Sequence, residues 1–261
     1  MVSTSIHHIR HATFILKLAS KRLLVDPMLA PKETYPAIPF TGNKRRNPLC
    51  DLPTPLPKLD ELDAVLLTHL HQDHFDQKAR DWIRKETPIF CQPTDEAALE
   101  KMGFKDVRPI EKETSWEGFA IRRRSAKHGK GFLSWAMGKT SSYVIEAAQS
   151  GSIYIAGDAI YEKDFEAHLQ QVSPKTVVLN AGAAGFLVGA PITQTETDIL
   201  NIADLLPDAK IIVLHMDAMN HCRLDRKKLI ESLRRIGNDH RVVVPENGEV
   251  VRIQPWNIAT K

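Results

Sequence analysis

Short apolar segments separated by polar turns open the chain, and this pattern is typical of β-strands. Residues 12–18 and 23–25 are apolar and flank a polar stretch at 20–22, which predicts a hairpin. Residues 27–57 then contain so many prolines that neither a long helix nor a central strand fits there. We expect a long surface loop, and loops of this length often bind ligands or cover sites.

Strands and helices alternate through the rest of the chain. The apolar runs predict strands at 63–68, 89–91, 107–110, 119–122, 142–146, 152–156, 177–180, 211–214 and 242–244. Helices are predicted around Trp82, at 95–102 between an N-cap at Thr94 and a final Gly103, at 195–206 and at 225–236. The helix at 195–206 carries one apolar stripe, which predicts that it covers a sheet. Neither a repeat nor a Gly/Ser linker divides the sequence, so we predict one α/β domain over residues 1–261.

The composition narrows the class of protein. The 261 residues are 43% hydrophobic and 26% charged, which is typical of a globular chain rather than a disordered or membrane-spanning one. Lys and Arg number 35 against 32 Asp and Glu, and the resulting charge of +3 argues against a dedicated nucleic-acid binder. Three isolated cysteines, Cys50, Cys91 and Cys222, are typical of reduced thiols. Because the first 18 residues also lack an apolar signal segment, we expect a cytoplasmic protein that does not bind a membrane.

The strongest chemical signal is a run of three histidines and one aspartate directly after the strand at 63–68. The run is His69-Leu-His71-Gln-Asp73-His74. Neighbouring side chains in a loop can face different sides, so one metal ion could bind His69 with His71 and a second Asp73 with His74. These four side chains do not complete two coordination spheres, because catalytic zinc usually takes three protein ligands and a water. Further ligands must come from distant segments.

Suitable ligands occur in three later segments. Asp158 and His215 stand at the C-terminal ends of apolar strands, where α/β architectures place their active sites. His128 follows residues 125–127. Together with the histidine run, these residues offer enough donors for two metal ions.

With these residues in this order, the chain resembles the hydrolases of the metallo-β-lactamase superfamily. The resemblance runs from the His69–His74 segment through His128 and Asp158 to His215 and covers nearly the whole chain. It implies a four-layer αββα sandwich with the site at one edge of two sheets. It also implies one metal held by His69, His71 and His128, a second held by Asp73, His74 and His215, and a bridging Asp158.

Two segments near the start of the chain narrow the resemblance. His11-Ala-Thr-Phe-Ile-Leu and Leu24-Val-Asp-Pro27 are similar to the branch that contains ascorbate-6-phosphate lactonase. His71 stands where diiron flavoproteins carry Glu, and Asp158 where the best-known zinc β-lactamases carry Cys, so neither oxygen reduction nor a thiolate-ligated antibiotic site is expected. The implied cofactors are two divalent ions, first Zn²⁺, with Mn²⁺ or Fe²⁺ as alternatives.

Hydrolysis is the chemistry that such a site supports. Two cations within about 4 Å lower the pKa of a shared water toward ~7 and stabilise the leaving oxygen. We expect Asp73 both to bind metal and to orient the hydroxide. Asp217 and His221 follow the last ligand, and either could line the pocket. His221 is the candidate for protonating a leaving group or binding substrate, with a core or capping role as the alternative.

For most of the other histidines and for the loops, a structural role is the first interpretation and a functional role the alternative. His11 is interpreted as a structural histidine, with an approach to the metals as the alternative, and His7, His8, His168 and His240 are predicted on the surface. Residues 129–138 combine glycines with aromatic side chains and form either a substrate wall or lid, or an ordinary loop. The basic residues 44–46 are expected to be solvated. The glycine-rich turn at 180–185 is expected beside the site.

The sequence therefore predicts a metal-dependent hydrolase that uses a metal-bridging hydroxide. The expected substrate is an ester, lactone or phosphoester of a small polar molecule, and the positive net charge also allows an anionic one. A nuclease or phosphodiesterase of the same superfamily is the first alternative, although the charge of +3 provides little support for it. A metal-containing binding protein without turnover is the second. The sequence does not set the oligomeric state.

Overall fold

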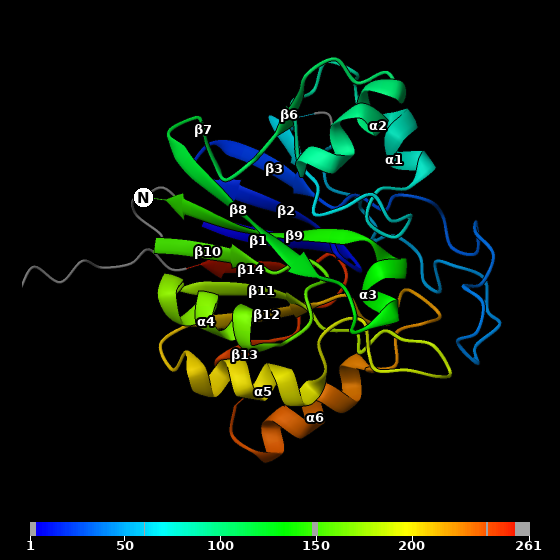
Figure 1. Cartoon of the computed structure of the whole chain (residues 1–261), viewed down its shortest axis with the longest axis vertical. Coiled ribbons are helices and arrows are strands. Elements are labelled where there is room, and N and C mark those ends of the chain that lie inside the picture. Colours follow the sequence, from blue (N-terminus) through cyan, green and yellow to red (C-terminus); the bar gives the residue numbers. More distant parts are fainter. Residues whose placement is uncertain (1–3, 60, 148–150, 239, 254–261) are drawn as a thin grey trace, which may run out of the picture.

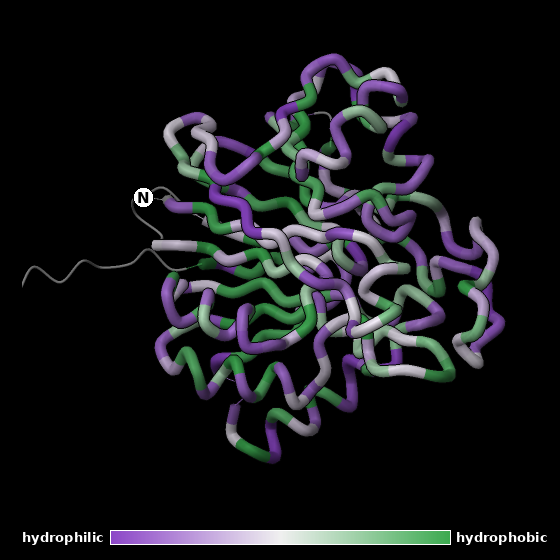
Figure 2. Tube along the Cα trace, in the orientation of Figure 1, coloured by the Kyte–Doolittle hydropathy of each residue, from purple (hydrophilic) through white to green (hydrophobic). Residues whose placement is uncertain are grey.

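The computed structural model describes residues 4–59, 61–147, 151–238 and 240–253, which form two seven-stranded β-sheets packed face to face (Figure 1). Both ends of the predicted domain, residues 1–3 and 254–261, lie outside the described residues. Hydrophobic residues follow the strands in the middle of the molecule, and hydrophilic ones dominate the outer helices and loops (Figure 2).

The first sheet combines the beginning and the end of the chain. It contains β1 (Thr4–Arg10), β2 (Thr13–Leu18), β3 (Lys21–Val25), β4 (Ala64–Leu66), β5 (Ile89–Cys91), β6 (Val107–Pro109) and β14 (Val250–Ile253). The strand order is β14-β1-β2-β3-β4-β5-β6. Pairing is antiparallel from β14 to β3 and parallel from β3 to β6.

The second sheet has the same plan. It contains β7 (Glu113–Trp116), β8 (Phe119–Lys127), β9 (Lys139–Ala147), β10 (Gly151–Ile155), β11 (Thr176–Asn180), β12 (Lys210–Leu214) and β13 (Val242–Val243). The strand order is β13-β12-β11-β10-β9-β8-β7. Pairing is antiparallel from β7 to β10 and parallel from β10 to β13.

Helices cover the outer faces of both sheets. The first sheet packs against α1 (Gln77–Trp82) and α2 (Glu96–Lys101), which share a buried apolar cluster with it. The second packs in the same way against α4 (Lys163–Val172), α5 (Glu196–Leu205) and α6 (Arg226–Arg235). A third cluster fills the space between the two sheets. The predicted αββα sandwich is confirmed.

Side-chain caps explain where α1, α5 and α6 begin, and Asp76 caps the first of them. Thr195 forms a capping box with Asp198 at the start of α5, and Asp225 caps α6. The predicted cap at Thr94 is wrong, because a 3₁₀ turn over Pro93–Asp95 precedes α2, which begins one residue later than predicted. Gly103 adopts the left-handed conformation expected of a residue just after a helix.

Three strands were not predicted, namely β1, β7 and β14. In β1 the reason is that His8 and Arg10 are polar but fully buried. The guanidinium of Arg10 donates hydrogen bonds to three backbone carbonyls, those of Met28, Ala30 and Cys50. The prediction that His8 lies on the surface is wrong, whereas His240 is exposed as predicted.

Residues 27–57 form the predicted loop, in which the described residues make only an isolated bridge between Tyr35 and Asn47. Arg10 ties both flanks of the loop to β1. Asn220, from the loop after β12, accepts a hydrogen bond from the Asn47 amide and another from the backbone of Ile38. The loop is therefore attached to both sheets.

The glycine-containing segment 129–138 is not a plain loop. It forms a six-residue helix, α3 (Phe132–Met137), between β8 and β9. Among the described residues, none of the helices combines the length and apolar character that crossing a bilayer requires.

Candidate metal centre

The predicted site residues all stand where strands of the two sheets end. The loop after β4 carries His69, Asp73 and His74, which are buried, and His71, which is half-buried. The other three follow β8, β10 and β12 and are also buried: His128, Asp158 and His215. The sandwich thus brings together all seven residues.

The side chains form two groups on either side of Asp158. Donor atoms of His69, His71 and His128 lie within 4.8 Å of one another, which matches the first predicted triad. In the second group, donor atoms of the other predicted triad are equally close: Asp73, His74 and His215. Asp158 Oδ2 lies 3.5 Å from Nε2 of His128 and 3.4 Å from Nε2 of His215. Its carboxylate therefore faces both groups.

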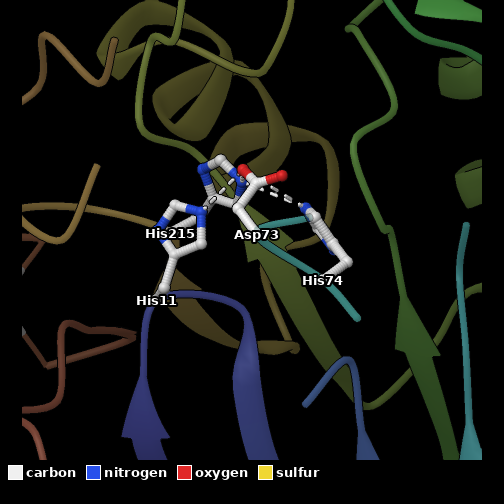
Figure 3. A group of neighbouring side chains, drawn as sticks. All are labelled: His11, Asp73, His74 and His215. Atoms are coloured by element: carbon white, nitrogen blue, oxygen red, sulfur yellow. Dashed lines mark hydrogen bonds and ion pairs between the residues drawn. The ribbon is translucent and has the colours of Figure 1, made fainter. Parts of the chain in front are cut away.

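His11 belongs to the second group (Figure 3). It occupies the turn between β1 and β2, and its Nε2 lies 3.1 Å from Oδ2 of Asp73. The ring also stacks on His215, with 3.6 Å between the ring centroids. This position matches the alternative interpretation of His11, an approach to the metal site, rather than the structural one preferred from the sequence. It depends on the β1–β2 turn meeting the end of β12, which no local spacing reveals.

Hydrogen bonds to the outer ring nitrogens fix the tautomers of three histidines. Nδ1 of His74 donates to Asp26 at 2.9 Å, and Nδ1 of His128 donates to the carbonyl of Ile192 at 2.8 Å. The hydroxyl of Thr68 donates to Asp26 and accepts from Nδ1 of His69. Burial lowers the pKa of His69 and His128, so in these two neutral rings the Nε2 lone pair is left for the interior of the cluster.

The charges in the cluster suit a cation. Burial alone would lower the pKa of His74, yet three carboxylates raise it well above its ordinary value: those of Asp158, Asp26 and Asp73. Burial favours the neutral form of Asp73 and Asp158, but the surrounding histidines hold the pKa of both carboxyls well below their usual range. Two ionised carboxylates thus share a proton held by histidine, and a divalent ion can replace that proton.

One buried nitrogen gives independent evidence for the same fit. Within the described part of the chain, Nε2 of His69 has no hydrogen-bond partner although it is buried. Burial, together with the charges of His74 and His71, lowers the pKa of His69 well below its ordinary value, so the ring is neutral. An unprotonated, unpaired imidazole nitrogen is the donor that zinc and similar metals bind. The residues present therefore fit a divalent metal ion.

The backbone near the cluster is unusually tight. His11, Asp26 and His215 all adopt positive φ angles, at 59°, 43° and 72°, which strained non-glycine residues tend to show at functional sites. A Cβ on Gly182 would lie 2.2 Å from the carbonyl oxygen of His215. Only glycine fits there, so the glycine-rich turn at 180–185 lies beside the site, as predicted.

A cavity of about 210 Å³ opens onto the cluster. Its polar wall is formed by His71, Gln72, Asp73, His128, Asp158 and His221. Its apolar wall is formed by Ile38, Met137, Phe186, Ile192 and Met219. The long loop and the segment 129–138 therefore both contribute to the wall.

The two residues expected after His215 have different positions. His221 lines the cavity, and its Nε2 lies 3.9 Å from Oδ2 of Asp73. Asp217 instead faces Arg226 at the start of α6 and does not line this cavity. Two supporting residues were not singled out from the sequence, Asp26 and Asn180, whose amide donates to Asp158. Asp26 belongs to the Leu24-Val-Asp-Pro27 segment that carries the resemblance, but that segment gave it no role in the site.

The fold and the site define the class of protein. A model of the "Beta-lactamase superfamily domain" matches residues 21–216, more than half of the chain. The chain therefore belongs to the β-lactamase superfamily and has the metallo-β-lactamase fold.

Particular relatives cover almost the full chain. The UPF0173 protein YddR of Bacillus subtilis (strain 168) is 35% identical over 249 residues, which are 94% of this chain and 98% of that protein. A "possible metal-dependent hydrolase" from Veillonella parvula DSM 2008 superposes with a TM-score of 0.91 at 34% identity, covering 95% of this chain and 99% of that one. An isothiocyanate hydrolase from Delia radicum gut bacteria has a TM-score of 0.90 at 34% identity, covering 95% and 98%. Taken with the His/Asp cluster, these likenesses identify the chain as a metal-dependent hydrolase.

Proposed function

We propose that the cluster binds two divalent metal ions, with zinc as the first candidate and manganese or iron as alternatives. His69, His71 and His128 hold one ion, and Asp73, His74 and His215 hold the other, with Asp158 between them. The mutual distances of these donors, within 4.8 Å in each group, support the assignment. His11 contacts Asp73 and positions its carboxylate.

The residues of the chain have separate tasks in the hydrolysis. Bound divalent ions supply a water of lowered pKa and polarise the bond under attack. Asp73 reaches the cavity and orients the attacking water, because its carboxylate is ionised and fixed by His11. Burial lowers the pKa of His221 to about 4, so its ring is neutral at neutral pH and can offer one N–H to the substrate.

The cavity wall supports a neutral, carbon-centred substrate. Among the described residues that line it there is neither Lys nor Arg, the usual partners of a phosphate. Of the bonds expected from the sequence, an ester or lactone carbonyl thus fits this wall better than a phosphoester. The carbon of an isothiocyanate belongs to the same class of neutral electrophile, and the 34% identical isothiocyanate hydrolase makes it the first substrate to test.

The proposed reaction converts an isothiocyanate and one water into a primary amine and carbonyl sulfide. The water oxygen bonds to the central carbon, and one of its protons goes to the nitrogen. The carbon–nitrogen bond then breaks, and the second proton also ends on the nitrogen. His221 is placed to bind the substrate nitrogen from the cavity wall.

The single observation that carries this proposal is the cavity that joins the His/Asp cluster to an apolar wall. The test is to purify the protein, measure bound metals by mass spectrometry, and follow the loss of phenethyl isothiocyanate with and without a chelator. We expect about two ions per chain and hydrolysis that the chelator abolishes. Parallel assays use an aryl ester, a lactone, an aryl phosphodiester and RNA.

The same assays decide against the proposal if it is wrong. Cleavage of the phosphodiester or RNA alone would establish the nuclease or phosphodiesterase alternative. A fully metallated protein that cleaves none of the substrates would support the binding-protein alternative.

We further infer that residues 1–261 act as one domain in the cytoplasm, with a small molecule rather than a nucleic acid as ligand. The shared cluster between the sheets supports a single folding unit. The three cysteines are free, which suits a reducing compartment.

A further inference from the structure

Five large apolar side chains are exposed on the three segments that also contribute to the apolar wall of the cavity. Phe40, Phe132, Trp135, Leu187 and Val188 are each between 69% and 85% exposed, and we call them the apolar rim. The four other exposed large hydrophobic side chains of the described residues are at most 50% exposed and lie elsewhere. Because a cluster of this kind has an unfavourable contact with water, it marks a binding surface.

The rim comes from three segments that touch one another. The backbone of Leu187 donates a hydrogen bond to the carbonyl of Phe40 at 2.7 Å. Leu133 of α3 packs so closely on Gly189 that a Cβ there would lie 2.9 Å from its Cδ1. Figure 1 shows α3 and the two loops on the same side of the molecule. Residues far apart in the sequence thus form one surface.

Each of these segments also contributes one side chain to the cavity wall. Ile38 precedes Phe40 by two residues, Met137 follows Trp135 by two, and Phe186 is adjacent to Leu187. The three segments that carry the rim therefore also build part of the apolar wall of the cavity. Within the rim, the rings of Phe132 and Trp135 pack with their centroids 5.5 Å apart.

The size of the cavity requires an extension. Its volume of about 210 Å³ is below the roughly 300–1,000 Å³ that encloses a typical drug-sized ligand. The reacting group fits such a space, and a longer substituent must extend beyond it. One wall of the cavity is apolar, so it favours an apolar substituent.

We propose that the apolar rim binds the hydrophobic substituent of the substrate and selects substrates with an extended apolar or aromatic tail. This inference rests on the proposed function for the reacting group, but the rim makes its own prediction. Affinity and kcat/KM should rise with tail length. An extra apolar group in contact with a hydrophobic site changes kcat/KM by roughly ten-fold or more.

The first test compares methyl, propyl and phenethyl isothiocyanate as substrates of the metal-loaded protein. The double variants Phe132→Ala with Trp135→Ala, and Leu187→Ala with Val188→Ala, remove parts of the rim. All four side chains are exposed, so the fold should tolerate these changes. Trp82→Ala at the end of α1 is the matched control, because Trp82 is exposed but does not line this cavity.

We expect each double variant to lower kcat/KM for the phenethyl substrate at least ten-fold and to keep kcat/KM for the methyl substrate within two-fold of the wild type. The control variant should match the wild type for all three substrates. An equal loss for all three tails, or no loss, would overturn the rim as the selecting surface while leaving the hydrolase assignment intact.

The second test does not need turnover. Calorimetric titration with N-phenethylurea and N-methylurea, neutral compounds with the same tails, should show tighter binding of the phenethyl compound, and this difference should vanish in the double variants. If the phenethyl compound binds more tightly but no isothiocyanate is hydrolysed, the role of the rim is supported and only the proposed reacting bond is rejected. If sedimentation instead shows self-association that the double variants abolish and no tail preference, the rim is a contact between two copies of the chain and the proposal is wrong.

Discussion

The carboxylate of Asp26 lies 2.9 Å from Nδ1 of His74, although 48 residues separate them in the sequence. The same carboxylate accepts hydrogen bonds from the backbone and the hydroxyl of Thr68. A single residue at the end of β3 thereby orients His74 directly and His69 through Thr68. Asp26 thus supports one histidine from each of the two donor groups.

Replacing Asp26 should weaken both metal sites. The variant Asp26→Asn keeps the shape of the side chain but removes the charge that holds Nδ1 of His74 protonated. Loss of such a partner typically lowers metal affinity about 10- to 100-fold. Competition with a chromogenic chelator measures the change. Glu86→Gln, which removes an exposed carboxylate paired with Lys105, is the control, and an unchanged affinity in both variants would contradict the supporting role.

Two ligand substitutions should separate the two donor groups. His71 belongs to one group only and is half-buried, so His71→Ala should lower the metal content from about two ions per chain to about one. Asp158 contacts histidines of both groups, so Asp158→Ala should reduce binding of both ions. Mass spectrometry gives the content, and circular dichroism shows whether the fold survives. Full metal content in both variants would reject the ligand assignment.

Gly182 should be intolerant of any side chain. In Gly182→Ala the new Cβ would meet the carbonyl oxygen of His215 at 2.2 Å, so the β12 end must move and His215 with it. We expect a loss of about 2 kcal/mol in unfolding free energy and weaker metal binding. Gly118→Ala is the contrast, since a Cβ there meets no atom within 4 Å and only the positive φ of 84° opposes it. The Gly118→Ala variant should lose about 1 kcal/mol in unfolding free energy and bind metal normally. Equal metal affinity in the two variants would argue against the close contact between Gly182 and His215.

His168 should make the stability depend on pH. Burial, with the nearby charges of Arg124 and Arg122, lowers its pKa to about 4 in the fold, against about 6.5 in an unfolded chain. As the pH falls, the unfolded chain takes up a proton first. The neutral His168 ring therefore makes its full contribution to the free energy of unfolding above pH 6.5, and this contribution is lost between pH 6.5 and 4. Because the ring is only half-buried, we expect a loss of about 1 kcal/mol.

Urea unfolding at pH 7 and pH 5 tests this dependence. His168→Gln keeps a partner for the hydroxyl of Tyr154, which lies 3.1 Å from Nδ1 of His168, but does not titrate. The variant should lose less stability at pH 5 than the wild type. An NMR midpoint for His168 near 6.5 would show that the environment does not shift its pKa.

The sequence predicts those parts of the site that follow from local order. The His69–His74 run and the strand ends before Asp158 and His215 follow directly from apolar patterning, and the fold confirms their convergence. The position of His11 does not follow, because it depends on a turn of one sheet meeting a strand end of the other. β1 is concealed for a related reason, since its buried Arg10 is satisfied by carbonyls from residues far along the chain.

The short helix α3 shows a different limit. The sequence predicts a substrate wall or lid, or an ordinary loop, for the segment with Phe132 and Trp135, and it does not predict a helix there. In the structure both are more than 70% exposed, beside a cavity whose wall the same helix completes. Their placement follows from the tertiary arrangement of three separate segments.

The attachment of the long loop by Arg10 keeps the loop's part of the cavity wall apart from the donors of the cluster. The guanidinium of Arg10 fixes the carbonyls of Met28, Ala30 and Cys50, so both flanks of the loop are held, and Asn220 binds the span between them at Ile38 and Asn47. The donors of the cluster stand on strand ends outside that span. A substitution at Ile38 should therefore change the cavity wall while the donors of the cluster keep their positions.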